Sequence, residues 1–138
     1  SLRRRHRQKC KMDSYKDDVK AITLKGIEGL AKIQEIMTTL RDNTPAQIGE
    51  HKVLKARDYK KDTITDLETG AVTPTGLPNS NVLYYELPDA AWVCFRPSGT
   101  EPKLKFYYGV KADSMEAADA KAAELGAAVM AIVEPMLG

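Results

Sequence analysis

The chain has 138 residues, 43% hydrophobic and 29% charged, which suits one soluble globular domain with its own core. No apolar run approaches the ~20 residues that span a bilayer, and no apolar segment follows the charged N-terminus, so we expect neither a membrane segment nor a secretory signal. Two cysteines, Cys10 and Cys94, are too few for a disulfide framework and favour a cytoplasmic location. His6 and His51 have no ligand partner at zinc-binding spacing, so no metal site is predicted.

The formal net charge of +2 hides an uneven distribution of charge. Residues 1–13 hold six Lys/Arg and one Asp and therefore carry +5, whereas the remaining residues carry −3. A basic tail can touch nucleic acid or an anionic surface, but such runs are more often simply solvated. We interpret residues 1–13 as a disordered terminus or as extra residues added for expression of the protein.

The first half of the chain predicts two strands and one helix. Residues 18–24 are rich in β-branched side chains and predict a short strand. Within 27–40, apolar residues recur three and four positions apart, as on one face of an amphipathic helix: Ile27, Leu30, Ile33, Met37 and Leu40. Residues 51–59 predict another strand, and 60–80, with two Gly and two Pro, predict a long functional or mobile loop.

The second half predicts three strands and a long helix. Residues 81–87 and 91–96 form a natural antiparallel hairpin across a short link, and 104–111 predict the next strand. A regular apolar stripe then begins at Met115 and predicts a C-terminal helix to Met136. The fold class is α+β, an antiparallel sheet of four to five strands with two helices packed on one face.

Residues 96–103, "RPSGTEPK", join two predicted strands and combine groups that suit a phosphate dianion. A guanidinium matches two phosphate oxygens, hydroxyls donate, glycine allows close backbone approach, and ammonium groups add positive field. The candidate phosphate-binding residues are Arg96, Ser98, Gly99, Thr100, Lys103 and Lys105. From composition alone, a Pro/Gly turn with a salt-bridged Arg96 explains the loop equally well.

The stretch "LPNSNVLYYELPDAAWVCFRPSGTEPKLKFYYGV" resembles the C-terminal domain of the α-D-phosphohexomutases of the phosphoglucomutase/phosphomannomutase type. That family carries an Arg-x-Ser-Gly/Asn-Thr-x-Pro phosphate-binding signature in its fourth and last domain. "VKAITLKGIEGLAKIQEIMTTLR" resembles the segment that opens this domain, so the resemblance covers residues 14–138. It implies that Arg96, Ser98, Gly99 and Thr100 grip the phosphate that is not being transferred.

The family interconverts hexose 1-phosphates and 6-phosphates through a bisphosphorylated sugar, with a phosphoserine and a magnesium ion held in other domains. This chain has no Ser-His-Asn-Pro stretch, no Asp-Gly-Asp-x-Asp-Arg loop and no Gly-Glu-x-Ser-Gly loop. The resemblance therefore implies a hexose phosphate ligand and partnership with the missing N-terminal mutase domains. We expect no catalytic residue in this chain, no activity from it alone, and no clue to glucose or mannose preference.

Two other functions remain open. The chain could be a non-catalytic module that binds a phosphorylated ligand or nucleic acid, or a structural domain whose loop is an ordinary turn. Nucleic acid is disfavoured because the body is net acidic and its basic groups cluster at one loop and the tail. The aromatic residues of the strand-like runs suit core packing or sheet-face cover better than base stacking: Tyr84, Tyr85, Trp92, Tyr107 and Tyr108.

Overall fold

The computed structural model of the protein describes residues 14–137, so our interpretation of the basic tail over residues 1–13 lies outside the described residues. The described part forms two helices, α2 (Gly26–Asp42) and α3 (Met115–Leu137). Its strands are β1 (Ser14–Thr23), β2 (Gln47–Ile48), β3 (His51–Lys52), β4 (Lys55–Asp58), β5 (Thr63–Asp66), β6 (Val72–Thr73), β7 (Leu83–Glu86), β8 (Trp92–Pro97) and β9 (Lys103–Ala112).

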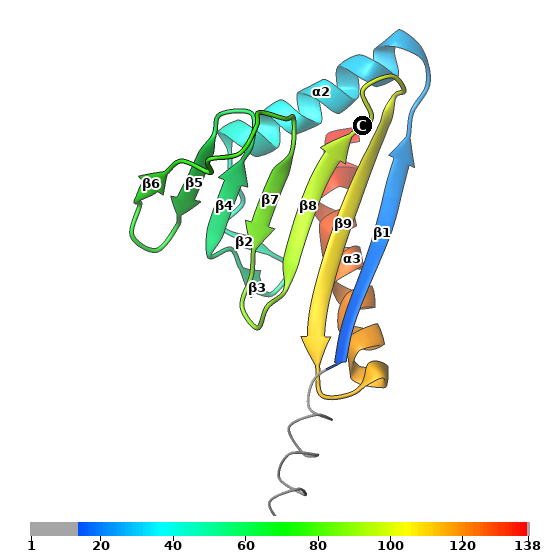
Figure 1. The fold of residues 1–138 in the computed structure, drawn as a ribbon. Helices are drawn as coiled ribbons and strands as arrows, with labels where there is room; N and C mark the ends of the chain where they lie inside the picture. Colours follow the sequence, from blue (N-terminus) through cyan, green and yellow to red (C-terminus); the bar gives the residue numbers. More distant parts are fainter. Residues whose placement is uncertain (1–13, 138) are drawn as a thin grey trace, which may run out of the picture.

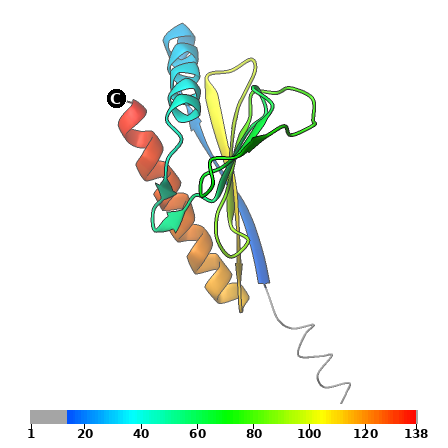
Figure 2. The same cartoon turned by 90° about the vertical axis from the view of Figure 1, so that its left-hand side faces the viewer.

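One antiparallel sheet of seven strands dominates the molecule, in the order β1-β9-β8-β7-β4-β5-β6, and β2 and β3 form a separate small ribbon. Both helices lie on the same face of this sheet, and within residues 14–137 the opposite face carries no helix (Figures 1 and 2). We call the uncovered side the helix-free face. The predicted α+β class is confirmed, with a sheet larger than the four to five strands expected.

The core fills the space between the sheet and the two helices. Phe95 and Phe106, opposite each other on β8 and β9, meet edge to face with ring centroids 5.6 Å apart. Met37 of α2 and Leu125 of α3 are fully buried against this layer. Small residues let α3 approach closely, because a Cβ on Gly126 would lie 2.5 Å from the hydroxyl oxygen of Tyr108.

Both helices follow the predicted apolar periodicity, apart from the first residue of each stripe. Ile27 and Met115 were expected on the packed faces, but both are exposed. Each lies in the first turn of its helix. The periodicity thus identifies the packed face and does not locate the point where packing begins.

The predicted loop over residues 60–80 was wrong in part, because it contains β5 and β6, which extend the sheet beyond β4 as a hairpin (Figure 1). The β4–β5 turn closes with a left-handed residue, Asp62, at φ 57°. An aspartate is a weaker turn signal than a glycine. Asp62 also accepts hydrogen bonds from the backbone and the hydroxyl of Thr75, which hold the following loop in place.

The first strand begins at Ser14 rather than at residue 18. Its early half is charged, with Lys16, Asp17 and Asp18, and β1 is an edge strand of the sheet. An edge strand tolerates charges that a central strand would exclude. No helix between residues 14 and 137 is long and apolar enough to cross a membrane.

Candidate phosphate-binding site

The candidate site lies on the helix-free face, where β8 and β9 meet their connecting loop. Cross-strand pairing sets Arg96 directly opposite Lys105, so two cationic side chains lie side by side. Their neighbours Phe95 and Phe106 point into the core, which leaves Arg96 and Lys105 on the opposite face. Strand alternation alone therefore brings these two predicted residues together.

Hydrogen bonds hold the loop between these strands in one shape. The backbone N–H of Ser98 donates to the carbonyl of Lys103 at 2.9 Å, which closes the loop at its base. The backbone N–H of Glu101 donates to the Ser98 Oγ at 3.3 Å. Because this oxygen accepts a bond from inside the loop, the hydroxyl proton of Ser98 can point toward a ligand.

The loop is also attached to the start of α2. The backbone N–H of Leu24, just before the helix, donates to the carbonyl of Pro102 at 2.7 Å. Gly29 of α2 allows this approach, because a Cβ there would lie 2.8 Å from the Cβ of Leu24 and 3.0 Å from that of Pro102. Figure 1 shows the β8–β9 loop beside this end of α2. The loop is thus supported from both sides and is largely shaped before any ligand binds.

A pocket of about 300 Å³ opens between the loop and the two strands, lined by Arg96, Pro97, Ser98, Gly99, Lys105 and Tyr107. Four of the six predicted residues line it, whereas Thr100 and Lys103 do not. Within residues 14–137, neither Arg96 nor Lys105 forms an ion pair with a carboxylate. The alternative interpretation, a turn held by a salt bridge of Arg96, is therefore not supported, because Arg96 pairs with no carboxylate within residues 14–137.

Gly99 faces open space. A Cβ added there would meet nothing within 4 Å, and Gly99 is not among the residues with a left-handed backbone. The fold itself therefore does not require glycine at this position. The space around Gly99 is therefore open to a ligand, as the predicted role of Gly99 in close approach of a phosphate requires.

Tyr107 lines the pocket but lies outside the stretch of residues 96–103 and was not among the candidate residues of the sequence analysis. It was assigned to core packing or sheet-face cover, and the structure places it half-buried on the wall of the pocket. The signal was present in the sequence, because Lys105 and Tyr107 are two residues apart on one strand and must share a face.

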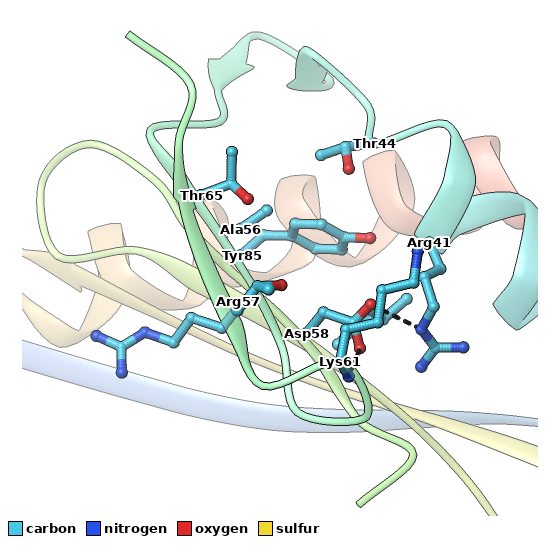
Figure 3. A pocket seen from close by; sticks show the side chains of 10 residues that line it. Arg41, Thr44, Ala56, Arg57, Asp58, Lys61, Thr65 and Tyr85 are labelled. Atoms are coloured by element: carbon cyan, nitrogen blue, oxygen red, sulfur yellow. Dashed lines mark hydrogen bonds and ion pairs between the residues drawn. The ribbon is translucent and has the colours of Figure 1, made fainter. Parts of the chain in front are cut away.

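A second pocket, of about 140 Å³, lies near the C-terminal end of α2 (Figure 3). Its buried Arg41 donates from Nε to Asp58 at 2.8 Å and from Nη2 to Asn81 at 2.8 Å. Asp58 in turn accepts the backbone N–H groups of Lys60 and Lys61. Since these bonds already engage the charged pair, we interpret this cluster as structural.

Arg57 lines the same pocket, but its side chain points away from Arg41 and Asp58 (Figure 3). On the helix-free face it pairs with Glu86 at 3.0 Å and lies 5.8 Å from the ring centroid of Tyr84. Among residues 14–137, no three His, Cys, Asp or Glu side chains gather in a way that could hold a metal ion.

Comparison with known proteins identifies the relatives of this chain. A phosphoglucomutase of Staphylococcus epidermidis is 34% identical over 103 residues, 75% of this chain and 19% of the relative. A phosphoglucomutase of Staphylococcus aureus strain MRSA252 is 38% identical over 97 residues, 70% of this chain and 17% of the relative. No family model matches the chain. The chain spans less than a fifth of the length of these curated relatives.

The α+β fold and these matches confirm the resemblance that the sequence indicates, namely similarity to a domain of the phosphohexomutases. More particularly, the named relatives are phosphoglucomutases, and a match to less than a fifth of each is consistent with a C-terminal domain of such an enzyme.

Proposed function

We propose that the chain is the phosphate-binding domain of an isomerase that interconverts hexose 1-phosphate and hexose 6-phosphate through a bisphosphorylated sugar. The observation that supports this most directly is the pocket on the helix-free face. It presents the guanidinium of Arg96, the ammonium of Lys105 and the hydroxyl of Ser98, and within residues 14–137 no carboxylate pairs with either cation.

Each group has a distinct task in this proposal. Arg96 forms two parallel hydrogen bonds to the phosphate, Ser98 donates its hydroxyl proton, and Lys105 supplies a second positive charge. Thr100 and Lys103, which belong to the same segment but do not line the pocket, are proposed to join these groups when the ligand is bound. Holding the remote phosphate in this way positions the reacting end of the sugar, which is how a binding domain assists a chemical step.

The phosphoserine and the magnesium ion that the resemblance implies belong to other domains. We therefore propose that this chain contributes no catalytic residue and works in the cytoplasm together with those domains. The purified chain is expected to show no turnover of glucose 1-phosphate in a coupled assay with magnesium and a hexose bisphosphate. Turnover above the blank would contradict this part of the proposal.

The binding itself is tested by titrating the ¹⁵N-labelled chain with inorganic phosphate. We expect amides between Arg96 and Lys105 to shift and saturate, with weak affinity because the rest of the cleft is absent. Arg96→Ala should weaken binding at least tenfold, about 1.5–3 kcal/mol for a hydrogen bond to a charged group.

Lys55→Ala is the matched control, because it removes a cation from the same face of the sheet outside the pocket. Equal weakening by Arg96→Ala and Lys55→Ala would show a diffuse effect of charge. That result, or the absence of any shift at high phosphate concentration, would overturn the proposed site.

A further inference from the structure

The phosphate pocket has one wall without charge. Moving along the sheet from the loop, the first row of the helix-free face carries Arg96 and Lys105. The next row places Tyr107 between Val19 of β1 and Cys94 of β8, which are its direct cross-strand partners. The surface therefore changes from cationic to apolar within two residues of strand.

The neighbours of Tyr107 keep this row apolar at neutral pH. Burial raises the pKa of the Cys94 thiol to about 11, although the nearby Arg96 guanidinium acts in the opposite direction. The thiol is therefore protonated and uncharged under ordinary conditions. On the other side, Val19 is 49% exposed and adds an aliphatic surface at the sheet edge.

The pocket also exceeds what a phosphate ion needs. Its volume of about 300 Å³ reaches the range of cavities that hold small organic molecules, roughly 300–1,000 Å³. Such sites pair a few fixed polar groups with an aromatic or apolar wall. Arg96, Ser98 and Lys105 supply the polar groups here, and Tyr107 supplies the aromatic wall.

We propose that the ring of Tyr107 is the platform for the hexose ring of the ligand whose phosphate Arg96, Ser98 and Lys105 hold. This inference rests on the proposed function of the pocket. A pyranose ring presents C–H groups on its flat faces, and covering such a face with a phenol ring removes apolar surface from water. Tyr107 thereby orients the sugar and selects cyclic over acyclic phosphate monoesters.

The test compares three ligands on the full chain by NMR titration: glucose 1-phosphate, glycerol 3-phosphate and inorganic phosphate. The wild-type chain should bind glucose 1-phosphate about fivefold more tightly than glycerol 3-phosphate, the order expected for covering one ring face. Tyr107→Ala should abolish this preference and leave the affinity for inorganic phosphate within about twofold. The retained phosphate binding also shows that the variant is folded.

Two further variants identify what the ring does. Tyr107→Phe keeps the aromatic face and should keep the preference for glucose 1-phosphate. Tyr15→Ala is the matched control, since Tyr15 lies opposite Lys111 on the same face, 64% exposed and outside the pocket. It should change none of the three affinities.

The possible results separate this inference from the proposed function. If the wild-type chain does not bind inorganic phosphate, the proposed function fails and the inference fails with it. If phosphate binds but the wild-type chain does not prefer the sugar phosphate, or Tyr107→Ala keeps the preference, the phosphate site stands and the platform is refuted. A loss in Tyr107→Phe equal to that in Tyr107→Ala, or an equal loss in Tyr15→Ala, also refutes it.

Discussion

At the scale of single residues, two glycines of the β8–β9 hairpin show opposite constraints. Gly109 lies beneath the indole of Trp92, and a Cβ there would overlap that ring and come within 2.7 Å of a carboxylate oxygen of Asp17. Trp92 cannot easily move aside, because its ring stacks on Tyr84 with centroids 5.7 Å apart. Gly99, in contrast, has open space around it.

We therefore expect Gly109→Ala to destabilise the fold and Gly99→Ala to leave it unchanged. Overpacking against the Trp92 ring should cost about 1–3 kcal/mol of the free energy of unfolding. Gly99→Ala should remain within about 0.5 kcal/mol of the wild type, as other unconstrained surface changes do. Urea denaturation followed by tryptophan fluorescence measures both. Equal stability of the two variants would contradict this expectation and show that the Trp92 ring can move aside from its stack on Tyr84 at little cost.

At the scale of secondary-structure elements, the end of α2 is joined to β4 by the Arg41–Asp58 pair. Both side chains are nearly buried, at 7% and 12% exposure, and their atoms approach to 2.8 Å. Burying two charges is costly, so such a pair need not stabilise the fold relative to apolar residues. Removing one partner is different, because the other charge is left buried without compensation.

Asp58→Ala is therefore expected to lower the free energy of unfolding by about 3–5 kcal/mol, because it leaves the buried charge of Arg41 without a carboxylate partner. Glu68→Ala is the control, because its contact with Lys52 spans 3.8 Å between exposed side chains. That change should cost less than about 1 kcal/mol. Thermal denaturation followed by circular dichroism provides the measurement.

A double variant, Arg41→Met with Asp58→Leu, sharpens the test of this pair. If the cost arises from an uncompensated charge, removing both charges should be less damaging than Asp58→Ala alone. A double variant at least as unstable as Asp58→Ala would indicate that the hydrogen bonds to Asn81, Lys60 and Lys61 carry the effect.

At the scale of the whole molecule, several weak acids are packed into the sheet in their neutral form. Burial is the main cause that raises the pKa of Tyr84, Tyr85 and Tyr108 above the ordinary value of 10, and that of Cys94 from 9 to about 11. Tyr85 and Tyr108 are both 1% exposed, and the hydroxyl of Tyr85 donates to the carbonyl of Leu40 at 3.5 Å. These groups ionise more readily in the unfolded chain.

The consequence is a loss of stability in base. A group whose pKa is raised by folding stabilises the protein below its unfolded pKa, and this contribution disappears as pH rises through the folded pKa. The free energy of unfolding should therefore fall steadily from about pH 9 upward, which urea titrations at pH 7, 9 and 10.5 can measure. Cys94→Ala should make the decline shallower between pH 9 and 11. A constant stability up to pH 10.5 would contradict this account.

The sequence by itself determined the features that depend on local pattern. Apolar repeats at three and four residues indicated α2 and α3, and the short link after residue 87 indicated the β7–β8 hairpin. The candidate loop was recognised because its residue types suit phosphate and stand where a strand ends. Family resemblance was likewise readable from two contiguous stretches.

Only the tertiary structure decided what depends on distant partners. It extended the sheet through β5 and β6, paired Arg41 with Asp58, and placed Tyr107 rather than Thr100 on the wall of the pocket. Periodicity records which face of an element is apolar, but it does not record which strand lies beside it or in what register. Those choices come from packing the whole chain around one core, and the shape of the pocket follows from them.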